Sequence, residues 1–214
     1  MNHIVLPALI FALSLPAIPP AAAAILVADS VADYSGVQGQ DNWYYGYAQW
    51  PSHSGYAFIP LTYDSLYDRW HIAGMTFYWT SIWSWGTHPN GTNVSRAAPV
   101  EHWTIRRWVS EVSGPIAIDL FYQPIGGGST EKMVFQNGAL VYATTNYSAS
   151  ESLVFPVAAG DFIDFVLGPN GDDYDDTTEF RMQIYAQGEA QIPEPSTVLL
   201  SAAGLAVLVW LRRR

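Results

Sequence analysis

The chain of 214 residues carries 9 basic and 19 acidic side chains, so its formal net charge is −10 at pH 7, and it contains no cysteine. The lack of cysteine excludes disulfides, thiolate metal sites and cysteine nucleophiles. The acidic excess makes nucleic acid and anionic lipid surfaces poor partners, whereas neutral polymers and divalent cations are suitable ones.

The first 24 residues have the plan of a secretory signal peptide. An apolar stretch over residues 4–15 is followed by prolines and then by residues 21–24, whose small side chains suit cleavage. A second cleavage position follows Ala28. An N-terminal membrane span is the alternative, but the stretch is too short for it and the prolines interrupt it. We therefore expect export, with a folded domain over residues 25–191.

The domain has short alternating apolar runs broken by Gly, Pro, Asn and Asp, a pattern typical of antiparallel β-structure. Asn137-Gly138 predicts a type I′ hairpin between residues 133–136 and 139–142, because both turn residues tolerate positive φ. Further turns are expected at residues 159–161 and 168–171. The predicted strands are residues 43–49, 74–80, 102–110, 116–123, 132–136, 139–145, 152–157, 162–167 and 179–187. Strands this numerous predict an all-β, antiparallel two-sheet sandwich or jelly roll.

Several stretches of this domain resemble a β-sandwich module that is repeated in exported bacterial surface proteins. The first is residues 33–40, which read Asp-Tyr-Ser-Gly-Val-Gln-Gly-Gln. The other matching stretches are residues 42–47, 88–89, 106–110, 113–114, 160–165 and 174–177. Such modules are similar to carbohydrate-binding jelly rolls. Residues 63–85 depart from the pattern because they are unusually aromatic.

Eight of the nine tryptophans lie between Trp43 and Trp108. Four aromatic residues within this segment share parity, so in one extended strand they would face the same side. Flat indole faces pack well against pyranose rings, while nearby carboxylates and imidazoles bind the hydroxyls. The candidate carbohydrate-binding residues are Trp79, Trp83, Trp85, Asp64, Asp68 and His88, to which Phe77 and His71 are added. The alternative is that the tryptophans fill the core of the sandwich.

An acidic stretch precedes the last predicted strand. Its carboxylates are Asp172, Asp173, Asp175 and Asp176, in a loop that also contains Gly171. Dense oxygen ligands in a glycine-containing loop suit Ca²⁺, although the spacing does not follow the EF-hand template. The alternative is a solvated loop whose last residues open the strand. Calcium is the one cofactor that the sequence suggests.

No motif marks the domain as an enzyme. H-E-x-x-H and G-x-S-x-G are absent, and the glycines at residues 126–128 read as a turn because they do not lead from a strand into a helix. Arg106 and Arg107 are expected to pair with Glu101 or Asp164 across strands. The alternative is a small secreted hydrolase acting on glycans, whose paired carboxylates would come from Asp64, Asp68, Glu101, Glu111 and Asp119.

The tail has three parts, which are Pro193-Glu194-Pro195, an apolar run over residues 198–211 and three arginines at residues 212–214. Ser196 can cap a helix that follows the prolines. A helix from Ser196 to Leu211 has 16 residues and spans about 24 Å, less than the ~30 Å hydrocarbon core of a bilayer. The arginines stay on the cytoplasmic side, so the domain is placed outside.

The order of these three parts closely resembles the PEP-CTERM sorting signal of exported bacterial proteins. The residues that carry the resemblance are Pro193, Glu194, Pro195, Arg212, Arg213 and Arg214. The resemblance implies that an exosortase, a membrane transpeptidase, recognises and processes residues 192–214. An ordinary C-terminal membrane anchor is the alternative.

Together these patterns predict an exported protein of the cell surface or extracellular matrix, attached to the membrane by its C-terminal helix or released after processing. We expect a non-catalytic structural or adhesive module that binds extracellular polysaccharide and no nucleic acid. A purely structural domain with every aromatic side chain buried is a further alternative.

Overall fold

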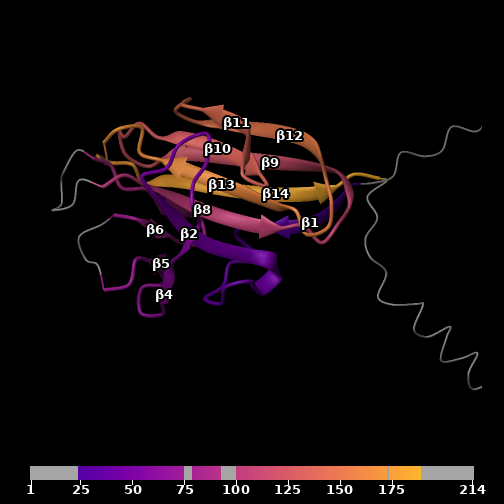
Figure 1. Ribbon diagram of the computed structural model, residues 1–214, viewed down its shortest axis with the longest axis horizontal. Coiled ribbons are helices and arrows are strands. Elements are labelled where there is room, and N and C mark those ends of the chain that lie inside the picture. The colour runs from indigo at the N-terminus through magenta and orange to yellow at the C-terminus, as the bar shows by residue number, and fades with distance from the viewer. Residues whose placement is uncertain (1–23, 75–78, 93–99, 173, 189–214) are drawn as a thin grey trace, which may run out of the picture.

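The computed structural model describes residues 24–74, 79–92, 100–172 and 174–188. Within these ranges the chain forms fourteen strands and one short 3-10 helix, η1 (Gln40–Asn42), and every strand pair is antiparallel. The all-β class and the two-sheet sandwich are therefore confirmed (Figure 1). Residues 1–23 of the predicted signal peptide, Phe77, Asp173 and the whole predicted sorting tail lie outside the described residues.

Two sheets pack face to face. Sheet A has the strand order β12-β9-β14-β7-β6-β5-β4, and β1 also pairs with β14; sheet B has the order β11-β10-β13-β8-β2-β3. The strands of sheet A are β1 (Ile25–Asp29), β4 (Thr62–Asp64), β5 (Arg69–His71), β6 (Ser81–Ile82), β7 (Gly86–His88), β9 (Gly114–Pro124), β12 (Ala149–Val157) and β14 (Thr178–Ala186). The strands of sheet B are β2 (Trp43–Gln49), β3 (Ile59–Pro60), β8 (His102–Val109), β10 (Glu131–Gln136), β11 (Ala139–Thr144) and β13 (Phe162–Gly168).

The long strands agree with the sequence prediction to within a few residues at each end. Gln136 pairs with Ala139 around Asn137-Gly138, whose φ angles of 50° and 82° are those of a type I′ turn. The predicted strand over residues 74–80 is wrong for the residues that are described, since Gly74 lies in a turn and neither Trp79 nor Thr80 belongs to a strand. Strands β6 and β7 follow instead, each only two or three residues long.

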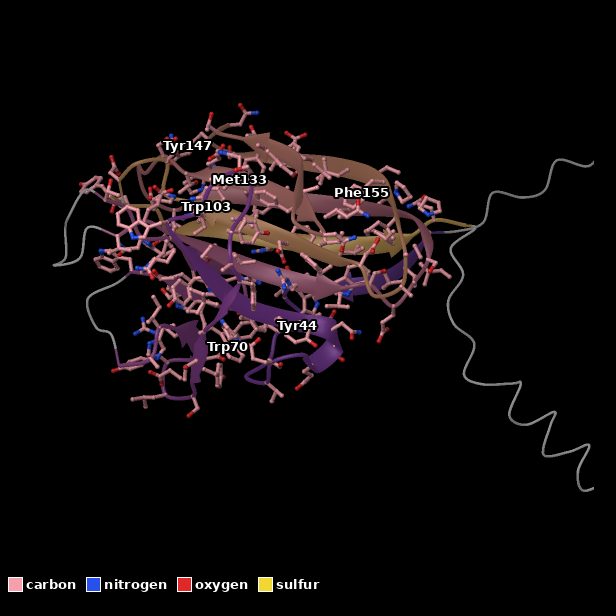
Figure 2. All side chains as sticks on the ribbon, in the orientation of Figure 1. Tyr44, Trp70, Trp103, Met133, Tyr147 and Phe155 are labelled. Atoms are coloured by element: carbon pink, nitrogen blue, oxygen red, sulfur yellow. The ribbon has the colours of Figure 1, made fainter. Side chains whose placement is uncertain are left out.

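The core lies between the sheets and is aromatic. Trp43, Trp70 and Trp108 are almost fully buried there, and Tyr45 of β2 stacks on Trp70 of β5 at a centroid distance of 5.0 Å. Trp70 is labelled in Figure 2. Trp50, by contrast, is 60% exposed. The alternative in which every aromatic side chain is buried is therefore wrong, and the core accounts for only part of the tryptophans.

The outer face of sheet B is covered by the segment that joins β2 to β3. Tyr56 and Phe58 from this segment pack on a second apolar cluster that contains Trp103, Met133 and Phe135 (Figure 2). On sheet A, by contrast, the outward residues of β9, β12 and β14 include exposed side chains.

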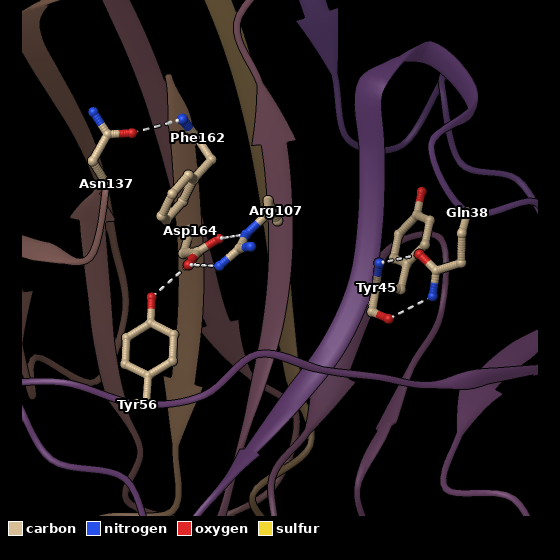
Figure 3. A network of polar contacts seen from close by, with 7 residues as sticks. All are labelled: Gln38, Tyr45, Tyr56, Arg107, Asn137, Phe162 and Asp164. Carbon is tan, nitrogen blue, oxygen red and sulfur yellow. Dashed lines mark hydrogen bonds and ion pairs between the residues drawn. The ribbon is translucent and has the colours of Figure 1, made fainter. Parts of the chain in front are cut away.

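A polar network lies within the same cover (Figure 3). Arg107 donates two hydrogen bonds to Asp164, of 2.7 and 2.8 Å, and Tyr56 donates a third of 2.5 Å. The guanidinium of Arg107 lies between the rings of Phe58 and Phe162, at 4.3 and 4.1 Å. The predicted cross-strand pairing of this arginine with Asp164 is confirmed.

Candidate carbohydrate-binding face

The outer face of sheet A is defined by its register. Residues directly opposite one another on neighbouring strands point to the same side. Ile82 and Thr87 form one such pair, and Thr87 donates a hydrogen bond to Thr104 of sheet B, so this pair points inward. Ser81 and His88, the next pair, therefore point outward.

Two aromatic stacks lie on this outer face. The rings of Trp83 and Trp85 are 5.7 Å apart and nearly parallel, at 10°. The ring of Trp79 stacks on His88 at 5.3 Å and 25°. Trp85 is 40% exposed, Trp79 and Trp83 are half-buried, and His88 is covered. We call these four side chains the aromatic ledge.

The ledge is built by a hairpin, and the prediction of one extended strand is wrong. β6 and β7 pair around a turn that contains Ser84 and Trp85, and the amide of Trp83 donates to the carbonyl of Gly86 at 2.8 Å. Trp85 reaches Trp83 by folding back from the turn, and Trp79 and Trp83 lie on either side of β6, outside its two residues. The prediction that Trp83 and Trp85 lie together is confirmed, but a hairpin turn brings them together, not one extended strand.

Arg106 holds the hairpin from beneath. Its guanidinium is fully buried and donates to the carbonyls of Ser30, Ser84 and Gly86 at 2.9 to 3.1 Å, and also to the carbonyl of Trp83. Burial lowers its pKa to about 10, so it stays charged at neutral pH. In the described part of the chain, it forms no ion pair with a carboxylate. The predicted pairing with Glu101 or Asp164 is wrong for this arginine, because it points inward.

Arg106 lies where β1 and the β6–β7 hairpin meet in sheet A. β14 pairs with β1 along its C-terminal half and with β7 at its N-terminal end. Ser30 bonds Met182 of β14 through its amide and its hydroxyl, and the amide of Phe180 donates to the carbonyl of Trp85 at 3.0 Å. β1 and the hairpin therefore meet end to end along one strand, and Arg106 binds carbonyls from both.

The predicted polar partners lie on the neighbouring hairpin. Asp64 and His71 pair across β4 and β5 at 3.6 Å, and His71 lies opposite Ser81, which places both on the face of the ledge. Asp68 lies in the turn between them, where its carboxylate accepts a 2.6 Å hydrogen bond from Tyr63. The sheet thus brings Asp64 and His71 to the candidate face, whereas Asp68 occupies the hairpin tip.

The acidic loop is anchored by packing. Asp176 is fully buried, Asp175 is exposed, and the side chain of Asp172 accepts the amide of Tyr174 at 3.0 Å. A Cβ atom on Gly128 would lie 2.5 Å from the carbonyl of Tyr174, so the glycine turn is required for close contact with this loop. Among the described residues, no group of three or more histidines and carboxylates is placed to hold a metal. Calcium binding stays a prediction, which a calcium-dependent rise in Tm would test.

The carboxylates considered for hydrolysis are spread over several elements. Glu101 accepts a 2.8 Å hydrogen bond from the indole of Trp103, and Glu111 is exposed in the connection between β8 and β9. Asp119 lies on the outer face of β9, and Asp64 and Asp68 lie on the β4–β5 hairpin. Hydrolase activity and its absence both stay predictions.

The described part of the molecule belongs to the class of antiparallel two-sheet β-sandwiches. Residues 191–214 match the PEP-CTERM protein-sorting motif, which includes the proline-flanked Glu194 and the terminal arginines. The chain is therefore an exported protein that is sorted by an exosortase-type system and is held at the cell surface or in the membrane. No curated protein matches the chain. Within the described residues, no helix is long and apolar enough to cross a membrane.

Proposed function

We propose that the sandwich is a non-catalytic adhesive module that binds extracellular polysaccharide through the aromatic ledge. In this proposal the exosortase-type system delivers the module to the surface, and the polymer joins it to the surrounding matrix. The acidic domain suits a neutral polymer better than an anionic one, since like charges repel.

The observation that carries the proposal is the geometry of the Trp83–Trp85 stack, in which the rings are nearly parallel and Trp85 is 40% exposed. Three of the four carbonyls bound by Arg106 belong to the turn that bears the stack. A ligand that meets an already ordered aromatic surface loses less side-chain entropy on binding.

Affinity gels test this proposal with the full chain. Soluble hydroxyethyl cellulose, dextran and xylan serve as neutral probes. We expect at least one polymer to retard the wild-type protein, and the double variant W83A/W85A to lose most of that retardation. Trp50→Ala is the matched control, because Trp50 is more exposed than Trp85 but lies beyond the end of β2 in sheet B. Full retardation of the double variant would overturn the proposal.

Sorting is tested separately at the tail. We expect Glu194→Ala to leave the full-length chain in the membrane fraction, because the exosortase-type enzyme no longer processes it. Mass spectrometry of the mature protein measures the cut, and Glu189→Ala, five residues upstream, is the control. Equal processing of both variants would contradict the role assigned to the motif.

The competing proposal is glycan hydrolysis. It requires two carboxylates either about 5–5.5 Å or about 6.5–9.5 Å apart around a bound sugar. The same polymers, assayed for new reducing ends, distinguish the two. Steady release that is lost in Asp119→Asn or Asp64→Asn would replace adhesion by catalysis.

A further inference from the structure

A second feature of the outer face of sheet A is a groove with a volume of about 690 Å³. It runs across β12, β9 and β14 and ends at the turn that follows β1. None of the ledge residues lines it. The side chains that line it on the outward side are Asp119, Phe121, Ser150, Ser152, Arg181 and Gln183.

The register arranges these side chains in two rows. Phe121 of β9 lies between Ser150 of β12 and Arg181 of β14. In the next row, Asp119 of β9 lies between Ser152 and Gln183. The residues between the rows, such as Leu120, are buried and point into the core, which confirms that both rows face outward.

Several polar groups at the rim of the groove are already satisfied. Gln183 donates a 2.8 Å hydrogen bond to Asp29, whose carboxylate also accepts two backbone amides, and Arg181 pairs with Glu179. In contrast, the side chains of Asp119, Ser150 and Ser152 are exposed and make no hydrogen bond to any described residue. The groove therefore presents a carboxylate and two hydroxyls beside one phenyl ring.

This combination has a chemical preference. A carboxylate accepts hydrogen bonds from two neighbouring hydroxyls, a serine hydroxyl both donates and accepts, and a phenyl ring packs on the apolar face of a pyranose. Arg181 pairs with Glu179, whereas the carboxylate of Asp119 has no ion-pair partner among the described residues. This negative charge would repel a uronic acid. A neutral sugar satisfies all of these groups.

We propose that the groove is a second subsite, which binds an uncharged pyranose unit of the same polysaccharide that the ledge binds. This inference rests on the proposed function. The two sites share β14, since Glu179 pairs with Gly86 of the hairpin while Arg181, the next outward residue, pairs with Phe121 of the groove. One polymer lying across β14 therefore contacts both.

The test uses the full chain and isothermal titration with the neutral polymer that retards it most. The groove variant is D119A/S152A, in which two exposed side chains are shortened. We expect its Kd to be about 30-fold higher, because the two shortened side chains each lose a hydrogen bond of the order of 1 kcal/mol. Gln123→Ala is the matched control, since Gln123 is an exposed outward residue of β9 that does not line the groove.

The outcomes separate this inference from the proposed function. Weaker binding of both D119A/S152A and W83A/W85A supports two subsites. Unchanged binding of D119A/S152A, with loss in W83A/W85A, overturns the groove and leaves the ledge. Loss in D119A/S152A alone overturns the ledge and leaves the groove, and no binding of any neutral polymer overturns both. Alginate, an acidic polymer, is the specificity probe, and tighter binding of alginate than of the neutral polymer would overturn the assignment of an uncharged sugar.

Discussion

Among single residues, Arg106 combines two properties that rarely occur together, namely complete burial and a set of partners made only of backbone carbonyls. A guanidinium is suited to this position because its planar fork offers five donors to several acceptors at once. The carbonyl of Gly86 also accepts the amide of Trp83, whereas a buried carbonyl that loses its donor costs free energy. Arg106 therefore supplies hydrogen-bond donors to backbone carbonyls at the buried point where β1 meets the β6–β7 hairpin.

Substitution of Arg106 should therefore destabilise the fold. We expect Arg106→Met to lower the free energy of unfolding by about 3 kcal/mol or more, since several carbonyls lose their donor. Arg106→Lys should restore part of this, because one ammonium cannot reach all four carbonyls. Urea unfolding followed by fluorescence measures the change. Arg181→Met, at a half-exposed position, should change stability by less than about 1 kcal/mol; an equal loss in both variants would contradict the role of Arg106.

His102 provides a pH-dependent contribution at the residue scale. It is buried and accepts or donates a 2.9 Å hydrogen bond with Thr80, and burial lowers its pKa from 6.5 to about 4. The unfolded chain therefore binds more protons than the folded chain between these values, so stability falls as the pH is lowered from about 6.5 towards 4.

We expect this loss to amount to roughly 2 kcal/mol and to disappear in His102→Gln. Unfolding midpoints in urea at pH 6.5, 5.5 and 4.5 measure it. The folded-state pKa values of Asp29 and Asp161 are lowered as well, so these groups act mainly below this window. A wild-type slope in His102→Gln would show that another group is responsible.

At the scale of elements, the sequence predicted the long strands of sheet A well because their buried and exposed residues alternate. β9 has inward and outward residues in strict succession, and such a period is visible without the structure. Strands of two or three residues, such as β6, contain no period to detect. Arg106 and Arg107 show the same limit for the site, since adjacent residues of a strand face opposite sides and only the assembled sheets reveal which side is interior.

The glycine turn at residues 126–128 packs closely against the acidic loop. The sequence predicted the turn but not this contact. A Cβ on Gly128 would lie 2.5 and 2.6 Å from the carbonyls of Tyr174 and Asp175, whereas a Cβ on Gly127 would meet nothing within 4 Å. We expect Gly128→Ala to cost about 1–3 kcal/mol through overpacking and Gly127→Ala to be nearly neutral. Thermal unfolding of the two variants measures this, and similar Tm values for both would disprove the close contact.

At the scale of the whole molecule, the pairing of β1 with β14 decides which of the two signal cleavage positions is compatible with the fold. Ala28 is buried, and residues 25–29 pair with 183–186. Cleavage after Ala28 would remove four of the five residues of β1, so we expect the mature chain to begin at or before Ile25. N-terminal sequencing of the exported protein tests this, and a mature start at Asp29 would contradict it.

The same pairing has a mechanical consequence. Ile25 lies opposite Ala186, so the domain begins and its last strand ends at one end of the sandwich (Figure 1). A molecule tethered through the residues after β14 and pulled by a polymer on sheet A carries the load lengthwise along that strand. The strand is bonded to β9 over nine consecutive residue pairs, which would have to slip together in shear instead of opening one by one like a zipper. The domain should therefore resist tension, because the tether follows directly on β14, which pairs with β9 along its whole length.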